Sequence, residues 1–582
     1  MLRHLLHIVA IAAALILAGC SGRVRTISVE MVATSDVHGR LFPFDFSMPY
    51  GTQQDGGLSR VSTWLQGERK IYGDRLLYFD VGDMTQGTPL AYYVRTADFS
   101  RSYAPSEVLN ELECTAATIG NHDLEGGITN LERYAKACDF PMLCANMCYA
   151  GTDMSYMDSY HIVERDGLRI AVVGMITPYA TFKIPASTID GFSVYDVREA
   201  AARIIPYIRE KEHPHLIVGL FHSGLENGIT DGRQFENETM TTAVEVPGFD
   251  VIFYGHDHIA SVRKVANCNG DSVLLINPGP YAQNVAVVSL DVSMQGDSIV
   301  DCSVNGSIES LADVAPDENL VRRYADKIDR VWKYQDSIAG RIDAPLDGYE
   351  AVCGPSTITG LFNSLIMERA GCEVSISSPY SESLHIDSGD FTMRDAWNLY
   401  PYENNMTYMM LKGSEIVGIL EYFSDRWMNT IKSENDTLLR LTRTEDGYKL
   451  CNRVFDFMTA GGIDYTVNVT KPAGHRVNVT SMSDGKAFNP DKLYKTGVSS
   501  FLACGAYGPF CEAVGLKGYE LRSRELFSTT SDFRYDIITR FCLKTEAGEE
   551  MHVGKPDNWK IIPEKMAGAA LARDIRLLQG GE

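Results

Sequence analysis

Short apolar runs alternate with clusters of polar residues through the first half of the chain. Runs rich in branched side chains occupy residues 27–34, 76–81, 116–119, 169–176, 216–221, 251–254 and 273–276. Runs of this length and composition predict buried strands, and a helix-like stretch at residues 105–112 precedes one of them. The pattern therefore predicts an α/β domain whose strands end in polar loops.

Five of the predicted strands end in side chains that can bind metal. The loops read Ser-Asp-Val-His-Gly, Gly-Asp, Gly-Asn-His-Asp-Leu-Glu, His-Ser-Gly and Gly-His-Asp-His. Strand ends are where α/β enzymes keep their chemistry. A single such loop is more often a polar turn than a site, but five in one domain indicate a common metal centre. The candidate ligands are Asp36, His38, Asp83, Asn121, His222, His256 and His258.

This set of ligands predicts a particular chemistry. Oxygen and imidazole groups without thiolate suit divalent Mn, Zn, Fe, Co or Ni. Seven ligands are too many for one catalytic ion, but they suit two ions that share a bridging carboxylate. Two ions roughly 3.5 to 4 Å apart can clamp a phosphoryl group for in-line attack. The residues therefore predict a phosphoester hydrolase.

The second half of the chain has a different pattern. Residues 317–338 are polar and free of Gly and Pro, with apolar residues at helical spacing, so we expect a helix that links two domains and begins after Pro316. Helices at residues 356–370 and 414–423, a strand at 373–377 and a strand pair at 464–469 and 476–480 predict a second α/β domain. Its notable residues are aromatic and occur in Tyr-Pro-Tyr-Glu-Asn (400–404) and Ser-Phe-Leu-Ala-Cys-Gly (500–505).

Length and composition exclude several classes of protein. The chain has 582 residues, too many for one hydrophobic core. Its formal charge of −23 disfavours polymeric nucleic acid as a partner. There are 13 cysteines but no Cys-x-x-Cys, which disfavours redox catalysis and thiolate zinc sites. Disulfide pairing and reduced core thiols both remain open.

The N-terminus predicts export. Arg3 precedes an apolar run from Leu5 to Leu17, which is too short for a membrane span, and small residues follow it. The sequence Leu-Ala-Gly-Cys at residues 17–20 resembles the bacterial lipobox, which implies removal of residues 1–19 and lipidation of Cys20. We therefore expect a membrane-anchored lipoprotein that faces the periplasm or the cell surface, with residues 20–26 as a tether. The alternative is a plain signal peptide with a coincidental cysteine.

The order of the five metal-binding loops resembles the calcineurin-like metallophosphoesterases. Over most of the mature chain the likeness extends to the bacterial 5′-nucleotidases and 2′,3′-cyclic-nucleotide 2′-phosphodiesterase/3′-nucleotidases. This resemblance implies a four-layered metallophosphoesterase domain at residues 27–315, a linking helix at 316–340 and an α/β nucleoside-binding domain at 341–582.

The resemblance also implies roles for individual residues. Asp36, His38, Asp83 and His258 would bind one ion, and Asp83, Asn121, His222 and His256 the other. His122 would stabilise the phosphoryl transition state, with Glu125 as its carboxylate partner where relatives usually have Asp; alternatively Glu125 is solvated and His122 acts alone. Tyr402 and Phe501 would stack on a base and Asn404 would contact the nucleoside, although a lone aromatic is more often ordinary core packing.

Two features favour the cyclic phosphodiesterase branch of the family. Tyr-Pro-Tyr-Glu-Asn resembles that branch's Tyr-Pro-Tyr-x-Asn, and Ser-Ser-Pro-Tyr at residues 377–380 resembles its Ala-Pro-Phe region. His258 also stands where 5′-nucleotidases often have Gln. The alternatives are a 5′-nucleotidase or nucleotide-sugar hydrolase and, in another class, a non-catalytic nucleotide- or metal-binding lipoprotein. The native metals and the oligomeric state stay open.

Overall fold

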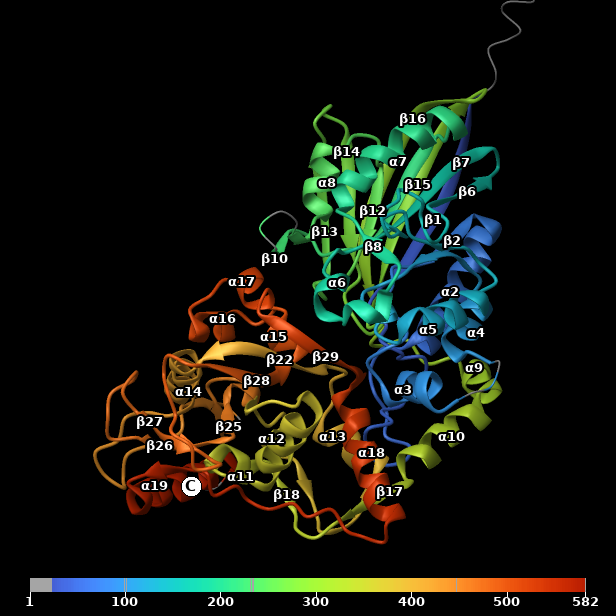
Figure 1. Cartoon of the computed structure of the whole chain (residues 1–582). Helices are drawn as coiled ribbons and strands as arrows, with labels where there is room; N and C mark the ends of the chain where they lie inside the picture. The colour runs from blue at the N-terminus through green and yellow to red at the C-terminus, as the bar shows by residue number, and fades with distance from the viewer. Residues whose placement is uncertain are drawn as a thin grey trace, which may run out of the picture.

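A computed structural model of the chain shows two α/β domains joined by a pair of helices (Figure 1). The structure describes residues 24–98, 100, 102–230, 232, 235–445 and 447–580. The proposed leader and Cys20 lie outside these residues. No helix within the described ranges is long and apolar enough to cross a membrane.

The N-terminal domain is built on two six-stranded mixed sheets. Each contains a parallel core, so several strands end at the same edge. The first sheet has the order β16 (Ser298–Ser310), β15 (Asn284–Gln295), β1 (Arg25–Thr34), β2 (Leu76–Asp80), β3 (Cys114–Thr118) and β4 (Met142–Leu143). The second has the order β13 (Ser261–Ala266), β14 (Ser272–Asn277), β12 (Val251–Tyr254), β9 (Leu216–His222), β7 (Leu168–Ile176) and β6 (Tyr160–Arg165).

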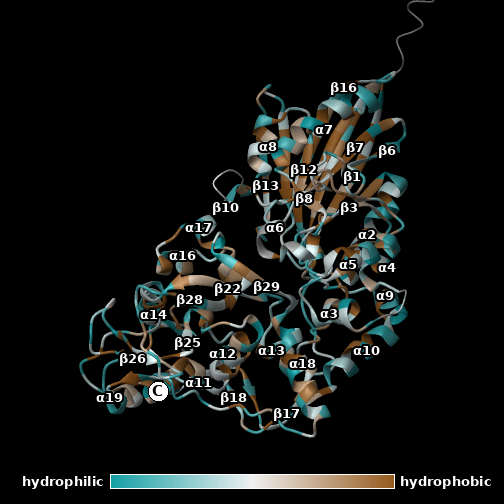
Figure 2. Cartoon of the chain, in the orientation of Figure 1, coloured by the Kyte–Doolittle hydropathy of each residue, from teal (hydrophilic) through white to brown (hydrophobic). Residues whose placement is uncertain are grey.

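The two sheets pack face to face between outer helices. Successive residues of a strand point to opposite faces. In β1, Met31 lies in the core between the sheets, whereas Val32 packs in the core beneath the helices. Phe79 of the first sheet meets Phe253 of the second with ring centroids 5.9 Å apart. Figure 2 shows the resulting apolar strands inside a polar outer layer. This is the expected four-layered arrangement, with α2 (Leu58–Tyr72), α4 (Ala104–Glu111) and α5 (Gly127–Lys136) outside one sheet and α7 (Val197–Glu212) and α8 (Thr239–Glu245) outside the other.

The C-terminal domain has a five-stranded and a three-stranded sheet. Long buried helices, including α12 (Thr357–Ala370), α14 (Gly413–Trp427) and α18 (Phe533–Glu546), pack against them. The larger sheet has the order β25 (Thr459–Gly461), β19 (Val374–Ser377), β28 (Leu493–Ser499), β22 (Asn405–Lys412) and β29 (Glu525–Asp532). The smaller one has the order β27 (Val477–Met482), β26 (Ile463–Asn468) and β30 (Trp559–Ile562).

The expected single linking helix is wrong in detail. The segment forms α9 (Glu318–Arg323) and α10 (Ala325–Gln335), which are separated at Tyr324. The Tyr324 hydroxyl bonds the Glu111 carboxylate at 2.9 Å, and its ring packs on Phe42, which fixes the break against the N-terminal domain. Ile338 already begins β17 (Ile338–Ile342), which pairs with β21 (Gly389–Thr392). Residues 338–342 therefore already pair with a strand of the C-terminal domain, three residues before the predicted boundary at 341.

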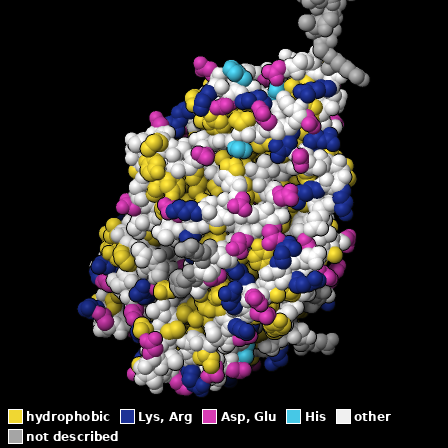
Figure 3. Space-filling model, turned by 90° about the vertical axis from the view of Figure 1, so that its right-hand side faces the viewer, with side chains coloured by type: hydrophobic (Ala, Val, Ile, Leu, Met, Phe, Trp, Pro, Cys, Tyr) yellow, Lys and Arg dark blue, Asp and Glu magenta, His cyan; other side chains and the backbone are white. Residues whose placement is uncertain are grey.

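The cysteines and the surface add little specialised chemistry. None of the 12 cysteines within the described residues forms a disulfide in this structure. On the face in Figure 3, acidic and basic side chains are interspersed, with no single basic tract.

Candidate metal centre and interdomain cleft

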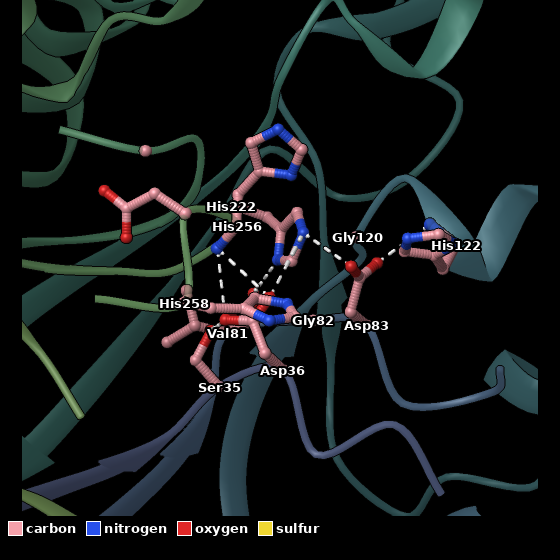
Figure 4. Close-up of polar contacts among 12 residues, drawn as sticks. Ser35, Asp36, Val81, Gly82, Asp83, Gly120, His122, His222, His256 and His258 are labelled. Atoms are coloured by element: carbon pink, nitrogen blue, oxygen red, sulfur yellow. Dashed lines mark hydrogen bonds and ion pairs between the residues drawn. The ribbon is translucent and has the colours of Figure 1, made fainter. Parts of the chain in front are cut away.

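The strand-end side chains gather in two clusters at one edge of the sandwich. Asp36, His38 and His258 form one, and Asp83, His222 and His256 form the other. Within each cluster the potential ligand atoms lie within 4.8 Å of one another. The loops after β1, β2 and β12 and the last residue of β9 supply these side chains, so both sheets contribute (Figure 4).

Asp83 lies between the two clusters. Its Oδ2 atom is 3.1 Å from His222 Nε2 and 3.9 Å from His38 Nε2. On the first cluster, His258 Nε2 is 3.3 Å from Asp36 Oδ1 and 3.1 Å from His38 Nε2. A carboxylate in this position can be shared by two cations, which is the bridging role predicted for Asp83.

The backbone is unusual at five of the candidate ligands. Asp36, His38, Asp83, His256 and His258 all have left-handed φ angles, from 51° to 77°. Such conformations cost about 1–3 kcal/mol each for residues other than glycine, and they persist where the surrounding structure enforces them. Strain concentrated on one set of polar side chains is a feature of functional sites.

Glycines bring the backbone close to these ligands. A Cβ atom on Gly120 would lie 2.0 Å from Asp83 Oδ1, and one on Gly255 would lie 2.6 Å from Asp36 Oδ2. The glycines of Gly-Asn-His-Asp and Gly-His-Asp-His are therefore required for close approach.

The imidazole nitrogens have the protonation pattern of metal ligands. His38 Nδ1 and His222 Nδ1 donate to the carbonyl oxygens of Gln86 (3.0 Å) and Val81 (2.7 Å). Because a carbonyl only accepts, Nδ1 carries a proton in each ring, and Nε2, which faces its cluster, is the atom that can bind an ion once its own proton is displaced. His256 is the reverse case: its Nε2 lies 2.8 Å from Glu236 Oε1, which leaves Nδ1 for an ion.

The electrostatics also favour a cation. Burial raises the pKa of Asp36, but the hydrogen bond with His258 and the charge of His222 outweigh it and lower that pKa to about 2. Burial lowers the pKa of His222, but Asp83 and Asp36 outweigh it and raise that pKa to about 10. Asn121 Oδ1 is buried without a hydrogen-bond partner, between two residues that contact Asp83. The site thus holds excess negative charge and an unused oxygen ligand, which fits divalent metal.

The loop after β3 places His122 beside this centre. The His122 backbone N–H donates to Asp83 Oδ1 at 2.8 Å, and its Nδ1 lies 2.8 Å from Glu125 Oε1. In Figure 4, His122 is on the opposite side of Asp83 from His222 and His256. Asp123 accepts four backbone N–H groups of the loops after β2 and β3, so it fixes these loops to each other.

A cleft of about 300 Å³ extends from His122 into the C-terminal domain. We call it the aromatic cleft. Tyr402, Phe501 and Asn404 all line it, so the structure brings the three predicted substrate contacts to one place. The Tyr402 side chain is 45% exposed, and its ring edge lies against Tyr380 with centroids 5.2 Å apart. The remaining lining residues are Ser378, Tyr380, Arg453, Phe455, Met458, Ser499 and Leu502.

Sequence reasoning missed four residues at the site. Glu236 reaches His256 from the hairpin of β10 (Asn227–Thr230) and β11 (Phe235–Asn237), and the Tyr179 ring packs 5.7 Å from His256. Arg453 directly precedes the short 3-10 helix η4 (Val454–Asp456) of the other domain, and Phe455 lies within it. None belongs to a motif, and only the fold brings them near.

The fold and the paired clusters define a metallophosphoesterase. Comparison with known families agrees: residues 30–260 match the model of the calcineurin-like phosphoesterases, and residues 338–514 match that of the 5′-nucleotidase C-terminal domain. The chain thus joins a calcineurin-like phosphoesterase domain to a 5′-nucleotidase C-terminal domain, and it is a phosphoester hydrolase. The family implies divalent metal ions, which the two clusters fit.

Individual relatives are distant. The Trifunctional nucleotide phosphoesterase protein YfkN of Bacillus subtilis is 22% identical over 83% of this chain, which spans only 36% of that protein. The 2′,3′-cyclic-nucleotide 2′-phosphodiesterase/3′-nucleotidase of Salmonella typhimurium is 20% identical, over 92% of this chain and 89% of its own length. The crystal structure of a 5′-nucleotidase precursor from Thermus thermophilus has 19% identity and a TM-score of 0.55, and covers 92% of this chain and all of its own. That structural likeness supports the shared fold.

Proposed function

We propose that this protein hydrolyses 2′,3′-cyclic nucleotides and 3′-nucleotides with two divalent ions. The observation that carries the proposal is the shared lining of the aromatic cleft. His122, from the loop beside the metal centre, lines it together with Tyr402, Asn404 and Phe501 of the other domain. A nucleoside stacked on those rings would present its phosphate to the metal centre.

Each group of residues has a separate role in the proposed reaction. Asp83 and the two clusters would hold ions, which when bound polarise the phosphoryl group and activate water. His122, oriented by Glu125 and by its bond to Asp83, would donate to a phosphoryl oxygen as negative charge develops there. Tyr402 and Phe501 would bind any base by stacking, and Asn404 would bind the nucleoside by hydrogen bonds.

The cyclic phosphodiesterase branch has the better support. His258 Nε2 lies 3.3 Å from Asp36 Oδ1, a position that suits a seventh metal ligand. The relative from Salmonella typhimurium matches along nearly the whole chain. A 5′-nucleotidase or nucleotide-sugar hydrolase is the alternative within the class. A protein that binds nucleotide or metal without turnover is the alternative outside it.

The location is part of the proposal. We infer that residues 1–19 are removed and that lipidated Cys20 anchors the protein to a membrane, facing the periplasm or the cell surface. The support is the Leu-Ala-Gly-Cys sequence at residues 17–20. Radiolabelled fatty acid should be incorporated by the wild-type chain and not by Cys20→Ser; equal labelling of both would contradict the anchor.

Substrate assays test the proposed activity. Mn-loaded protein without residues 1–20 should open 2′,3′-cyclic AMP and release phosphate from 3′-AMP. Asp83→Ala should abolish both reactions. Asp313 is an exposed aspartate far from the cluster residues in sequence, and Asp313→Ala should leave both reactions intact. A strong preference for 5′-AMP would contradict the assignment to the cyclic phosphodiesterase branch. Absence of turnover with every nucleotide would support the alternative that the protein binds nucleotide or metal without catalysis.

A further inference from the structure

A buried group of charged residues joins the two domains next to the aromatic cleft. Arg95, on α3 (Pro89–Thr96) of the N-terminal domain, forms an ion pair with Glu403 of the C-terminal domain. Their side chains are 8% and 1% exposed. Glu403 also accepts from Arg534 at 3.1 Å, and the Arg534 guanidinium carbon lies over the rings of Tyr92 (4.2 Å) and Trp397 (3.8 Å).

Arg95 also lies beside the loop of His122. A second interdomain cleft, of about 270 Å³, is lined by Arg95, Glu125 and Gly126 together with Glu403. A Cβ atom on Gly126 would come within 2.7 Å of Arg95 Cδ, so the arginine stem packs directly on this glycine. Burial lowers the pKa of Arg95, but the charges of Glu403, Asp532 and Glu125 outweigh it and raise that pKa.

Glu403 stands between two predicted substrate contacts in the chain. Tyr402 precedes it and Asn404 follows it, and both line the aromatic cleft. One arginine therefore contacts the loop that carries the substrate-binding side chains and packs on the residue next to Glu125.

We infer that Arg95 is a positioning residue that holds the loop of Tyr402 and Asn404 in register with the His122–Glu125 pair. The inference rests on the proposed nucleotide substrate. A nucleoside bound by one domain must deliver its phosphate to a centre built by the other, so the spacing of the two loops sets the geometry of attack. A misplacement of about 1 Å can lower a rate by about a hundredfold.

The charge pair is suited to this task because it is desolvated. Removing Glu403 would leave the charges of Arg95 and Arg534 buried together, and removing Arg95 would leave Glu403 with Arg534 alone, so the loops would separate or admit water. Arginine presents a planar fork, whereas lysine is a point charge on a flexible stem. Lysine at position 95 should therefore restore the spacing only in part.

The test compares a nucleotide with a substrate that has no nucleoside. Arg95→Met and Glu403→Gln should each lower kcat/KM for 3′-AMP at least about tenfold, while kcat/KM for p-nitrophenyl phosphate stays within about threefold. The double variant should lose no more than the more impaired single variant, because the two side chains act as a unit. Arg95→Lys should be intermediate.

The matched control is Lys327→Met. Lys327 is 6% exposed, close to the 8% of Arg95, and its Nζ lies 3.5 Å from Asp98 Oδ2, but it does not line either cleft between the domains. Its loss should lower the melting temperature and leave the ratio of the two activities unchanged.

The outcomes separate this inference from the proposed function. If wild type cleaves p-nitrophenyl phosphate but no nucleotide, the proposed function is wrong and the inference fails with it. If wild type cleaves 3′-AMP but the variants lose both activities equally, or keep both, Arg95 is only a structural contact. A selective loss of nucleotide turnover, with partial rescue by lysine, would support the positioning role.

Discussion

Tyr402→Ala removes one wall of the aromatic cleft at little structural cost. The side chain is 45% exposed, so its truncation should change the free energy of unfolding by no more than about 0.5 kcal/mol. Phe501 is less suitable because its ring packs against the apolar core of the C-terminal domain. Substitution of Tyr402 therefore tests nucleotide binding with little change in the free energy of unfolding.

The expected loss of nucleotide affinity follows from the free energy of base stacking. One aromatic ring contributes about 1–3 kcal/mol to the binding of a base, which corresponds to a factor of about 5 to 150 in affinity. We expect KM for 3′-AMP to rise by that factor, and for other nucleotides similarly, because stacking does not depend on the identity of the base. The rate of p-nitrophenyl phosphate hydrolysis should not change.

The assay is steady-state phosphate release by wild type, Tyr402→Ala and Tyr402→Phe, with the melting temperature of each. Phenylalanine keeps the ring and should keep the affinity. Tyr207→Ala, which removes an equally exposed tyrosine from α7 at 48% exposure, is the control for surface truncation. An unchanged KM in Tyr402→Ala, or an equal loss with the aryl phosphate, would refute a stacking role.

Two further predictions concern carboxylates. Glu125→Gln should lower kcat for both 3′-AMP and p-nitrophenyl phosphate by about tenfold to a hundredfold with little change in KM, because the carboxylate orients His122 from 2.8 Å; full activity would show that His122 acts without it. Glu238→Gln should raise the melting temperature at pH 9 but not at pH 5. Burial and the neighbouring Asp196 raise the pKa of Glu238 to about 8, so folding favours its protonated form, and that stability is lost as pH rises through 8. The exposed Glu199→Gln is the control, and an equal shift at both pH values would contradict the assignment.

The sequence could indicate which side chains gather in the two clusters because each of them is adjacent to a strand end. An apolar run followed by Gly-Asn-His-Asp fixes both the strand and the loop, and parallel pairing then brings such loops together. The nucleoside contacts Tyr402 and Phe501 could be proposed only through a family resemblance, because isolated aromatics have no local pattern that separates binding from packing.

The remaining features depend on tertiary contacts. Tyr324 interrupts the linking helix because its hydroxyl meets Glu111, more than two hundred residues away in sequence. Glu236 and Arg95 act on residues of distant segments, His256 and Glu403, and neither lies in a recognisable motif. The left-handed backbone of Asp36 and Asp83 likewise contradicts local preference, and it is enforced by the surrounding fold.

Anomalous diffraction from crystals of the Mn-loaded protein tests the central claim most directly. Data collected at the manganese edge should show two peaks roughly 3.5 to 4 Å apart. One peak should be contacted by Asp36, His38 and His258, the other by Asn121, His222 and His256, with Asp83 between them. A single peak, or none at Asp83, would contradict a two-ion phosphoesterase.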